Sequence, residues 1–158
     1  MLGPLSYQRL NELRRDRHVE GKARGYGFAT FVHPGSHVET SDIGENCLIL
    51  ENNVIQPFVQ IGDGVIIWTG CFIGYRSTLG DYCFLSAQAG LGDYVKLGKR
   101  SFLAGRAAVE SRVEVGETCF LDTGVLIRKN LPAESVVRSR GSRVSRYRAS
   151  RLKNRRFR

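Results

Sequence analysis

The sequence predicts an all-β protein, a three-sided parallel β-helix of about five coils, and three repeated features support this prediction. Counting in sixes from residue 43 to residue 127 meets an aliphatic residue every time. A second position, four residues after each aliphatic, is nearly always small, as at Cys47 and Ala89. Glycine follows the aliphatic once every eighteen residues, from Gly44 to Gly116. A fixed short repeat of this kind is typical of a parallel β-helix.

Each six-residue unit is expected to supply one short strand. The small residue stands two positions before the next aliphatic, and this spacing places both side chains on the inner face of a strand. The residues between them must turn the chain, and three units make one coil because the glycines recur every eighteen residues. Side chains fill such a prism, so any function must lie on its corners or where two prisms meet.

The chain is expected to divide into three segments. Residues 1–36 form an N-terminal helix and a capping strand, residues 37–132 the β-helix, and residues 133–158 a basic and flexible tail. Within the first segment, residues 6–22 have the pattern of a helix with Ser6 as a candidate N-cap, and residues 28–32 that of a strand. A cap is needed because the end of a solenoid exposes strand edges.

The positive charge is concentrated in the tail. Residues 138–158 contain nine arginines, one lysine and no acid, whereas the whole chain has a net charge of +9. One interpretation is a solvated tail, and the other is an arm that binds polyanions such as phosphate groups, nucleic acid or a membrane surface.

The four cysteines occupy the small inward position of the repeat, so we expect core residues and neither disulfides nor a zinc site. The three histidines, His18, His33 and His37, lie outside the regular coils, which argues against a metal centre. No apolar run approaches ~18 residues, and the N-terminus soon becomes charged. We therefore expect a cytoplasmic protein without a signal peptide or a transmembrane segment.

The residues from Trp68 to Tyr82 resemble the left-handed β-helix of the hexapeptide-repeat acyltransferases, in particular the sialic-acid O-acetyltransferase-like sugar acetyltransferases. Residues 28–34 and 55–58 resemble them too, and the similarity covers roughly residues 7–131. Members of this group commonly carry an N-terminal nucleotide-sugar-binding domain. The resemblance implies that this chain is truncated there and keeps only the last helix of that domain.

The resemblance also implies an activity and an assembly. Such enzymes are homotrimers that bind acetyl-CoA, the acyl donor, in the groove between neighbouring prisms. The acceptor is a sugar or a nucleotide-linked amino sugar used in cell-surface polysaccharide biosynthesis, and no metal takes part. A corner histidine acts as general base, because an imidazole that titrates near neutrality can take the proton of the acceptor.

By register, the catalytic histidine of these enzymes corresponds to Tyr75, and the residue that usually follows it corresponds to Arg76. Asp93 lies one coil later, beside Tyr75, and is a candidate base or orienting group. A tyrosine has a pKa near 10, which makes it a poor base at neutral pH. We assign Tyr75, Arg76 and Asp93 to the catalytic site.

The resemblance assigns four residues to the cofactor site. Phe84 takes another position that is often histidine, and Ala104, Gly105 and Arg106 lie in a turn whose small residues let CoA approach the backbone. Backbone N–H groups of the turns can hold the thioester oxygen. Further corner cations could meet the CoA phosphates: Lys99, Arg100, Arg112 and Lys129.

Three functions stay open on the sequence alone. The first is a trimeric acetyl-CoA-dependent sugar acyltransferase with altered catalysis. The second is a non-catalytic trimeric scaffold, and the third is an anion-binding protein that acts through its tail.

Overall fold

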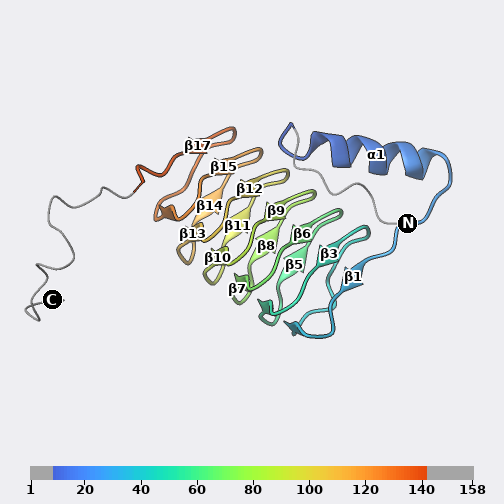
Figure 1. Cartoon of the computed structure of the whole chain (residues 1–158), viewed down its shortest axis with the longest axis horizontal. Helices are drawn as coiled ribbons and strands as arrows, with labels where there is room; N and C mark the ends of the chain where they lie inside the picture. Colours follow the sequence, from blue (N-terminus) through green and yellow to red (C-terminus); the bar gives the residue numbers. More distant parts are fainter. Residues whose placement is uncertain (1–8, 142–158) are drawn as a thin grey trace, which may run out of the picture.

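The fold is a parallel β-solenoid built from strands of two residues each. In the computed structural model, which describes residues 9–141, three parallel sheets form the sides of a prism of about six turns (Figure 1). The expected number of five coils was slightly too low, because strands at both ends extend the sheets beyond the regular repeat. β1 (Phe31–Val32) pairs with β3, β2 (His37–Val38) with β4, and β17 (Val136–Val137) with β15.

The strands follow one another around the prism from sheet to sheet. Sheet A contains β1, β3 (Leu48–Ile49), β6 (Ile66–Ile67), β9 (Phe84–Leu85), β12 (Phe102–Leu103), β15 (Phe120–Leu121) and β17. Sheet B contains β2, β4 (Val54–Ile55), β7 (Phe72–Ile73), β10 (Gly90–Leu91), β13 (Ala108–Val109) and β16 (Leu126–Ile127). Sheet C contains β5 (Gln60–Ile61), β8 (Thr78–Leu79), β11 (Lys96–Leu97) and β14 (Glu114–Val115).

The sheets meet at three corners, which are named here by the sheets they join. Corner AB comprises residues 50–53, 68–71, 86–89, 104–107 and 122–125. Corner BC comprises residues 56–59, 74–77, 92–95 and 110–113, and corner CA residues 44–47, 62–65, 80–83, 98–101 and 116–119.

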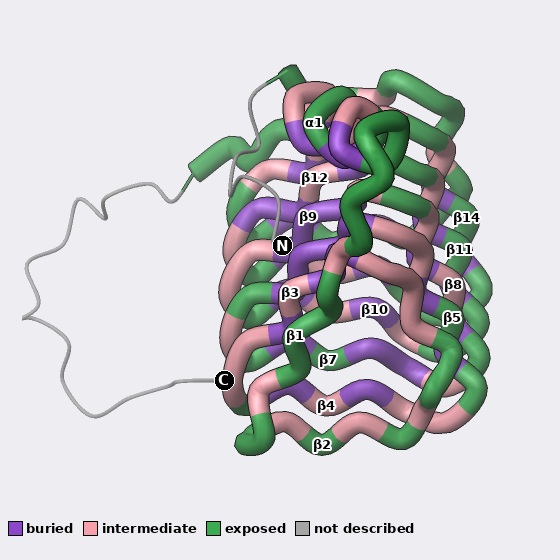
Figure 2. Tube along the Cα trace, turned by 90° about the vertical axis from the view of Figure 1, so that its right-hand side faces the viewer, coloured by how far each residue is buried: buried purple, intermediate pink, exposed green. Residues whose placement is uncertain are grey.

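The core has the two inward positions that the repeat predicts. The aliphatic residue of each regular coil is buried, and the small residue two positions earlier is buried beside it (Figure 2). Polar residues at the small position are satisfied by the backbone of the neighbouring coil. For example, Ser77 Oγ donates to the oxygen of Gly92 at 2.8 Å and accepts from the N–H of Val95 at 3.0 Å. The core therefore stays free of unpaired polar groups at this position.

The repeated glycine is required by the neighbouring coil. A Cβ added to Gly98 would stand 2.4 Å from the backbone carbon of Gly116 in the next coil. The residue that takes a positive φ is a different one, three positions after the aliphatic, and it recurs every sixth residue from Asn46 to Gly124. Most of these residues are not glycine, as at Phe58 and Arg76, so the composition of the turn does not reveal its backbone conformation.

One helix, α1 (Glu12–Ala23), lies along corner CA across several coils (Figures 1 and 2). Arg14, only 3% exposed, donates hydrogen bonds to the backbone oxygens of Gly64, Tyr82 and Cys83. His18 Nδ1 lies 3.1 Å from the hydroxyl oxygen of Tyr82. Burial lowers the pKa of Arg14 to about 10, which leaves the guanidinium charged at neutral pH.

The sequence placed the helix too early in the chain. It begins at Glu12 instead of near Ser6, and residues 1–8 lie outside the described residues. Asn11 precedes the helix in a left-handed conformation and makes no side-chain cap; its amide instead donates to the oxygen of Arg100 at 3.2 Å. Contact with the solenoid therefore fixes the start of the helix, and the local capping pattern does not.

The four cysteines are free and buried, as expected. Desolvation raises the pKa of Cys47 and Cys71 to about 11 and that of Cys83 to about 12. These thiols therefore stay protonated and unreactive at neutral pH.

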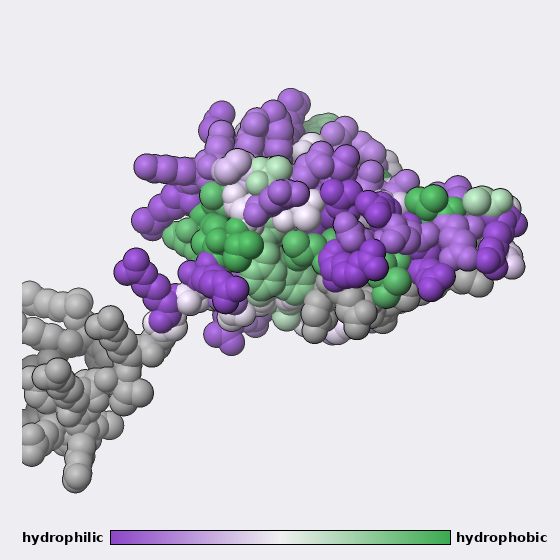
Figure 3. Space-filling view, turned by 90° about the horizontal axis from the view of Figure 1, so that it is seen from above, coloured by the Kyte–Doolittle hydropathy of each residue, from purple (hydrophilic) through white to green (hydrophobic). Residues whose placement is uncertain are grey.

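The outer surface is partly apolar. Phe84, Phe102 and Phe120 of sheet A and Trp68 of the adjoining corner AB form a stack along the prism, with ring centroids 5.1–6.1 Å apart. Figure 3 shows an area of hydrophobic residues bordered by hydrophilic ones on the face seen from above. No helix among residues 9–141 is long and apolar enough to cross a bilayer. Most of the basic tail, residues 142–158, lies outside the described part of the chain.

The close approach of the coils gives a testable prediction. We expect Gly98→Ala to lower the free energy of unfolding by about 1–3 kcal/mol, because its methyl group must displace backbone atoms of the next coil. Gly90→Ala is the matched control, because a Cβ at that position meets nothing within 4 Å. Urea unfolding followed by circular dichroism measures both, and equal stabilities of the two variants would contradict the explanation.

Candidate functional site

The predicted site residues fall on different sides of the prism. Tyr75, Arg76 and Asp93 lie on corner BC, whereas Ala104, Gly105 and Arg106 lie on corner AB. Sheet B separates these two corners within one chain. The structure therefore brings the predicted catalytic residues together, but it does not bring them to the cofactor candidates.

Tyr75 is the centre of an aromatic cluster on corner BC. Its ring meets the rings of Phe58 and Tyr94 edge-on, with centroids 5.5 and 5.7 Å away. Arg76 Nε donates to the hydroxyl oxygen of Tyr75 at 3.1 Å, and its guanidinium lies over Phe58 at 5.3 Å. This guanidinium donates to the phenol oxygen, so the tyrosine proton remains available for donation to another group.

Asp93 has a structural partner in this cluster. Its Oδ1 accepts a hydrogen bond from the backbone N–H of Tyr75 at 3.0 Å. Asp63 and Asp81 do the same on corner CA, where each accepts from a backbone N–H one coil earlier, at 2.9 Å. The contact of Asp93 is therefore one instance of a repeated hydrogen bond between coils, and only its second oxygen is free for chemistry.

Corner BC also carries an alternating column that was not predicted. Phe58, Arg76, Tyr94 and Arg112 all occupy the left-handed position of successive coils. Arg112 lies over the Tyr94 ring at 5.0 Å, as Arg76 does over Phe58. Such contacts between a cation and an aromatic face are attractive. In the sequence these four residues recur at a spacing of eighteen. Their shared left-handed backbone conformation, which the sequence does not show, was needed to recognise them as a column.

The corner cations differ in their partners. Lys99 pairs with Glu117 at 3.3 Å, and Arg100 donates to Thr118, both on corner CA. Among residues 9–141, Arg76, Arg106 and Arg112 have no carboxylate partner, and all three are exposed. These three arginines flank sheet B and are the corner cations best placed to meet an external anion.

Gly105 lies in a turn of corner AB with room for a side chain. A Cβ added to Gly105 would meet only the oxygen of Ala87, at 3.5 Å, which is an ordinary contact. Unlike Gly98, Gly105 is not required by the neighbouring coil. Gly105 is partly exposed, whereas Ala104 beside it is only 9% exposed. Arg106 Nε donates to Gln88 Oε1 at 3.2 Å on the same corner.

Phe84 lies apart from the other cofactor candidates. It belongs to sheet A, where it is stacked between Trp68 and Phe102 and is only 8% exposed. The guanidinium of Arg14 lies 5.9 Å from the centre of its ring. These contacts make Phe84 part of the packing beside α1, and its role in cofactor binding stays a prediction.

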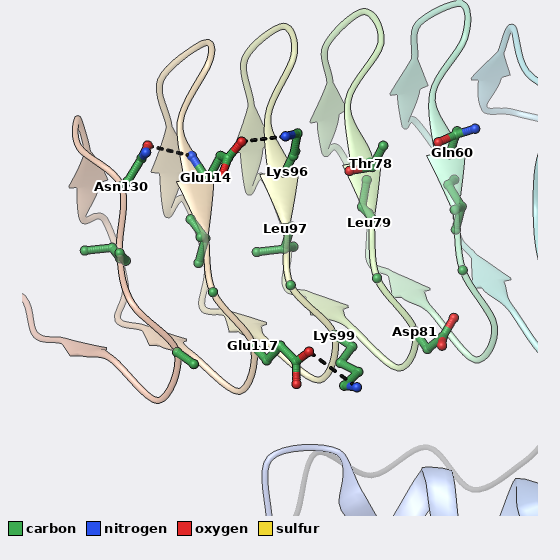
Figure 4. A pocket seen from close by; sticks show the side chains of 18 of the residues that line it. Gln60, Thr78, Leu79, Asp81, Lys96, Leu97, Lys99, Glu114, Glu117 and Asn130 are labelled. Atoms are coloured by element: carbon green, nitrogen blue, oxygen red, sulfur yellow. Dashed lines mark hydrogen bonds and ion pairs between the residues drawn. The ribbon is translucent and has the colours of Figure 1, made fainter.

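Two of the surface hollows in the described part of the chain bear on the candidate site. The larger, of about 1030 Å³, extends along sheet C, where Lys96 pairs with Glu114 at 2.5 Å (Figure 4). Of the residues predicted for the site, only the corner cation Lys99 lines it. The smaller, of about 380 Å³, lies at the N-terminal end of corner BC and includes Phe58, which touches the Tyr75 cluster. Proximity to the candidate residues makes the smaller pocket the more relevant one.

Within residues 9–141, no group of three histidine, cysteine or acidic side chains is arranged to hold a metal ion. His33 and His37 make local contacts. His33 Nδ1 accepts from the N–H of Gly35 at 3.0 Å, and His37 pairs with Glu39 at 2.5 Å.

The role of Asp93 can be tested by two substitutions. We expect Asp93→Asn to keep the native midpoint of thermal unfolding, because the amide oxygen still accepts from the Tyr75 N–H. Asp93→Ala removes this acceptor and should lower the midpoint by a few degrees. Differential scanning calorimetry measures both variants. An alanine variant as stable as the native protein would show that the hydrogen bond contributes nothing.

Comparisons with known proteins identify the repeat. Residues 40–75 match the family model described as bacterial transferase hexapeptide (six repeats). The chain is 38% identical over 101 residues to the UDP-3-O-acylglucosamine N-acyltransferase of Anaeromyxobacter sp. (strain Fw109-5). This match covers 61% of the chain but only 26% of that relative, so the chain spans about a quarter of its length.

Solved structures share the fold over most of the chain. One is a mutant of perosamine N-acetyltransferase from Caulobacter crescentus in complex with CoA and GDP-perosamine, with a TM-score of 0.75 and 27% identity. It covers 80% of this chain and 60% of that one. The acetyltransferase domain of PglB from Neisseria gonorrhoeae FA1090 has a TM-score of 0.78 and 24% identity, over 80% and 62% of the two chains. Residues 40–75 thus match the hexapeptide repeat of bacterial transferases, and the chain shares its fold with these acetyltransferase structures.

Proposed function

We propose that the protein transfers an acetyl group from acetyl-CoA to a sugar or a nucleotide-linked amino sugar, by O- or N-acetylation, in the biosynthesis of cell-surface polysaccharide. The observation that carries the proposal is the placement of two half-sites, on corners AB and BC, at the two edges of sheet B. The similarity to an N-acyltransferase and to an acetyltransferase structure that contains CoA supports it.

A second copy of the chain is needed to bring the half-sites together. From β4 to β16 the outward row of sheet B is apolar or small, with Val54, Phe72, Gly90, Ala108 and Leu126. Phe72 is 45% exposed and Leu126 48% exposed in the single chain. In a cyclic trimer with sheet B facing the axis, corner BC of one copy lies next to corner AB of its neighbour. Such a homotrimer buries these apolar side chains and completes the site.

In this trimer, corner AB binds the acyl donor and corner BC of the neighbouring copy supplies the catalytic residues. Ala104 and Gly105 let the acyl donor approach the backbone, and Arg106 and Arg112 meet its phosphates. The acceptor oxygen or nitrogen attacks the thioester carbonyl carbon, the bond to sulfur breaks, and the CoA thiolate leaves. The free oxygen of Asp93 accepts the acceptor's proton, and the hydroxyl of Tyr75 donates a hydrogen bond to the developing negative charge.

Calorimetry with acetyl-CoA tests this proposal on the purified protein. We expect binding with one site per chain, and Gly105→Leu should weaken it by at least tenfold because the side chain fills the space left for the cofactor. The matched control is Glu117→Leu, at the corresponding turn position of corner CA. A native protein that binds no acetyl-CoA, or a Gly105→Leu variant with native affinity, would contradict the proposal.

The alternative is a trimeric scaffold without catalysis. The hydrogen bond from the Tyr75 N–H to Asp93 favours it, because this structural contact accounts for an aspartate at this position without any catalytic role. Tyr75→His distinguishes the two. The transferase proposal predicts acetyl transfer by the native protein, measured as release of free CoA. The scaffold predicts none, with activity gained only by the histidine variant.

A further inference from the structure

The pocket at the N-terminal end of corner BC is a product of the irregular first coil. Between β2 and Ile43 the chain forms no strand of sheet C, and Ile43 joins this sheet only through an isolated bridge to Ile61. The missing strand leaves a hollow of about 380 Å³. It is lined by Glu39, Thr40, Ser41, Asp42, Pro57, Phe58, Val59 and Gln60.

The wall of the pocket is held in place by hydrogen bonds. Thr40 Oγ1 donates to the oxygen of Val59 at 2.8 Å and accepts from the N–H of Asp42 at 3.1 Å. These bonds attach residues 39–42 to the first complete coil. The pocket is thus formed before any ligand arrives, which lowers the entropic cost of binding.

Phe58 presents an aromatic surface at this pocket. Its side chain is 63% exposed, the highest exposure among the large hydrophobic residues described in residues 9–141. It also has a φ of 59°, a conformation that is costly for a bulky residue. Arg76 and Tyr75 contact part of the ring, and the rest of it is open to solvent. An exposed aromatic ring beside a polar pocket is suited to the apolar C–H face of a sugar ring.

The polar groups of the pocket are suited to the hydroxyl and amine groups at the edge of a sugar ring. The carboxylate of Asp42 has no side-chain partner among the described residues, and Gln60 supplies an amide. Glu39 is already paired with His37 at 2.5 Å. No lysine or arginine lines the pocket. An unpaired carboxylate in such a site favours a ligand that carries a protonated amine over a neutral one.

We propose that this pocket is the subsite for the sugar ring of the acceptor, with Phe58 under the ring and Asp42 selecting an amino sugar. The proposal rests on the transferase function proposed above, because the pocket matters only if the chemistry occurs at the adjacent Tyr75. The Phe58 and Tyr75 ring centroids are 5.5 Å apart, so a sugar on Phe58 lies next to the candidate catalytic cluster.

Saturation-transfer NMR on the full chain tests the subsite without acetyl-CoA. The probes are glucosamine, galactosamine and mannosamine, each compared with its neutral parent glucose, galactose or mannose. We expect a signal from at least one amino sugar that exceeds that of its parent. Phe58→Asn should reduce this signal at least fivefold and keep the fold, because asparagine tolerates a positive φ. Asp42→Asn should reduce the signal of the amino sugar to that of its neutral parent.

The matched control is Tyr26→Ala, which removes an aromatic side chain of similar exposure, 51%, far from corner BC in sequence. Its signals should equal those of the native protein. Absence of any signal in the native protein, or an undiminished signal in Phe58→Asn, overturns the subsite. If acetyl-CoA still binds in that case, the transferase proposal stands alone. If the sugar signals behave as expected but acetyl-CoA does not bind, the pocket is a sugar site and the transfer proposal fails.

Discussion

The spacing between successive coils is the constraint on which the rest of the structure depends. Strands that exchange backbone hydrogen bonds lie about 4.8 Å apart, so each coil must repeat the path of the one before it. This requirement leaves no room for a Cβ at Gly98, where the next coil's backbone would stand 2.4 Å away. It also explains why turn side chains such as Asp63 and Asp93 accept hydrogen bonds from backbone N–H groups of the preceding coil.

The same constraint arranges the surface. Because each coil repeats the path of its neighbour, residues eighteen positions apart are stacked in columns on the corners. Phe58, Arg76, Tyr94 and Arg112 form such a column, and the outward residues of sheet B form another. A rigid solenoid therefore holds chemical groups in fixed rows without a cavity in its core. The proposed site uses residues on corners AB and BC, and the proposed sugar subsite occurs where the first coil departs from the repeat.

The fold could be predicted from the sequence because the same two inward positions recur in every six-residue unit. The aliphatic residues and the small residues two positions before them, such as Ile73 and Cys71, took the inward positions expected of them. The docking of α1 could not be predicted, because it depends on Arg14 and His18 meeting backbone and side-chain groups some fifty or more residues away in the chain. Likewise, the left-handed position in each turn is mostly not glycine, so it left no compositional signal.

The candidate site was predicted only in part. Register alone placed Tyr75, Arg76 and Asp93 together, since it fixes which residues share a corner. It could not show that Phe84 is covered by aromatic neighbours, because that burial depends on α1 and on the stack along sheet A. Nor could it show that Asp93 has a structural hydrogen bond, which weakens the argument for a catalytic role.

The central claim is that the site is divided between copies of the chain across sheet B. The most direct measurement combines sedimentation equilibrium with acetyl-CoA calorimetry on Phe72→Glu, which places a charge on the apolar row of sheet B. Val136→Glu, at a comparably exposed position of sheet A, is the control. We expect Phe72→Glu to lose trimer formation and acetyl-CoA binding together while its circular dichroism spectrum stays native. A monomeric Phe72→Glu variant that binds acetyl-CoA with native affinity would contradict it.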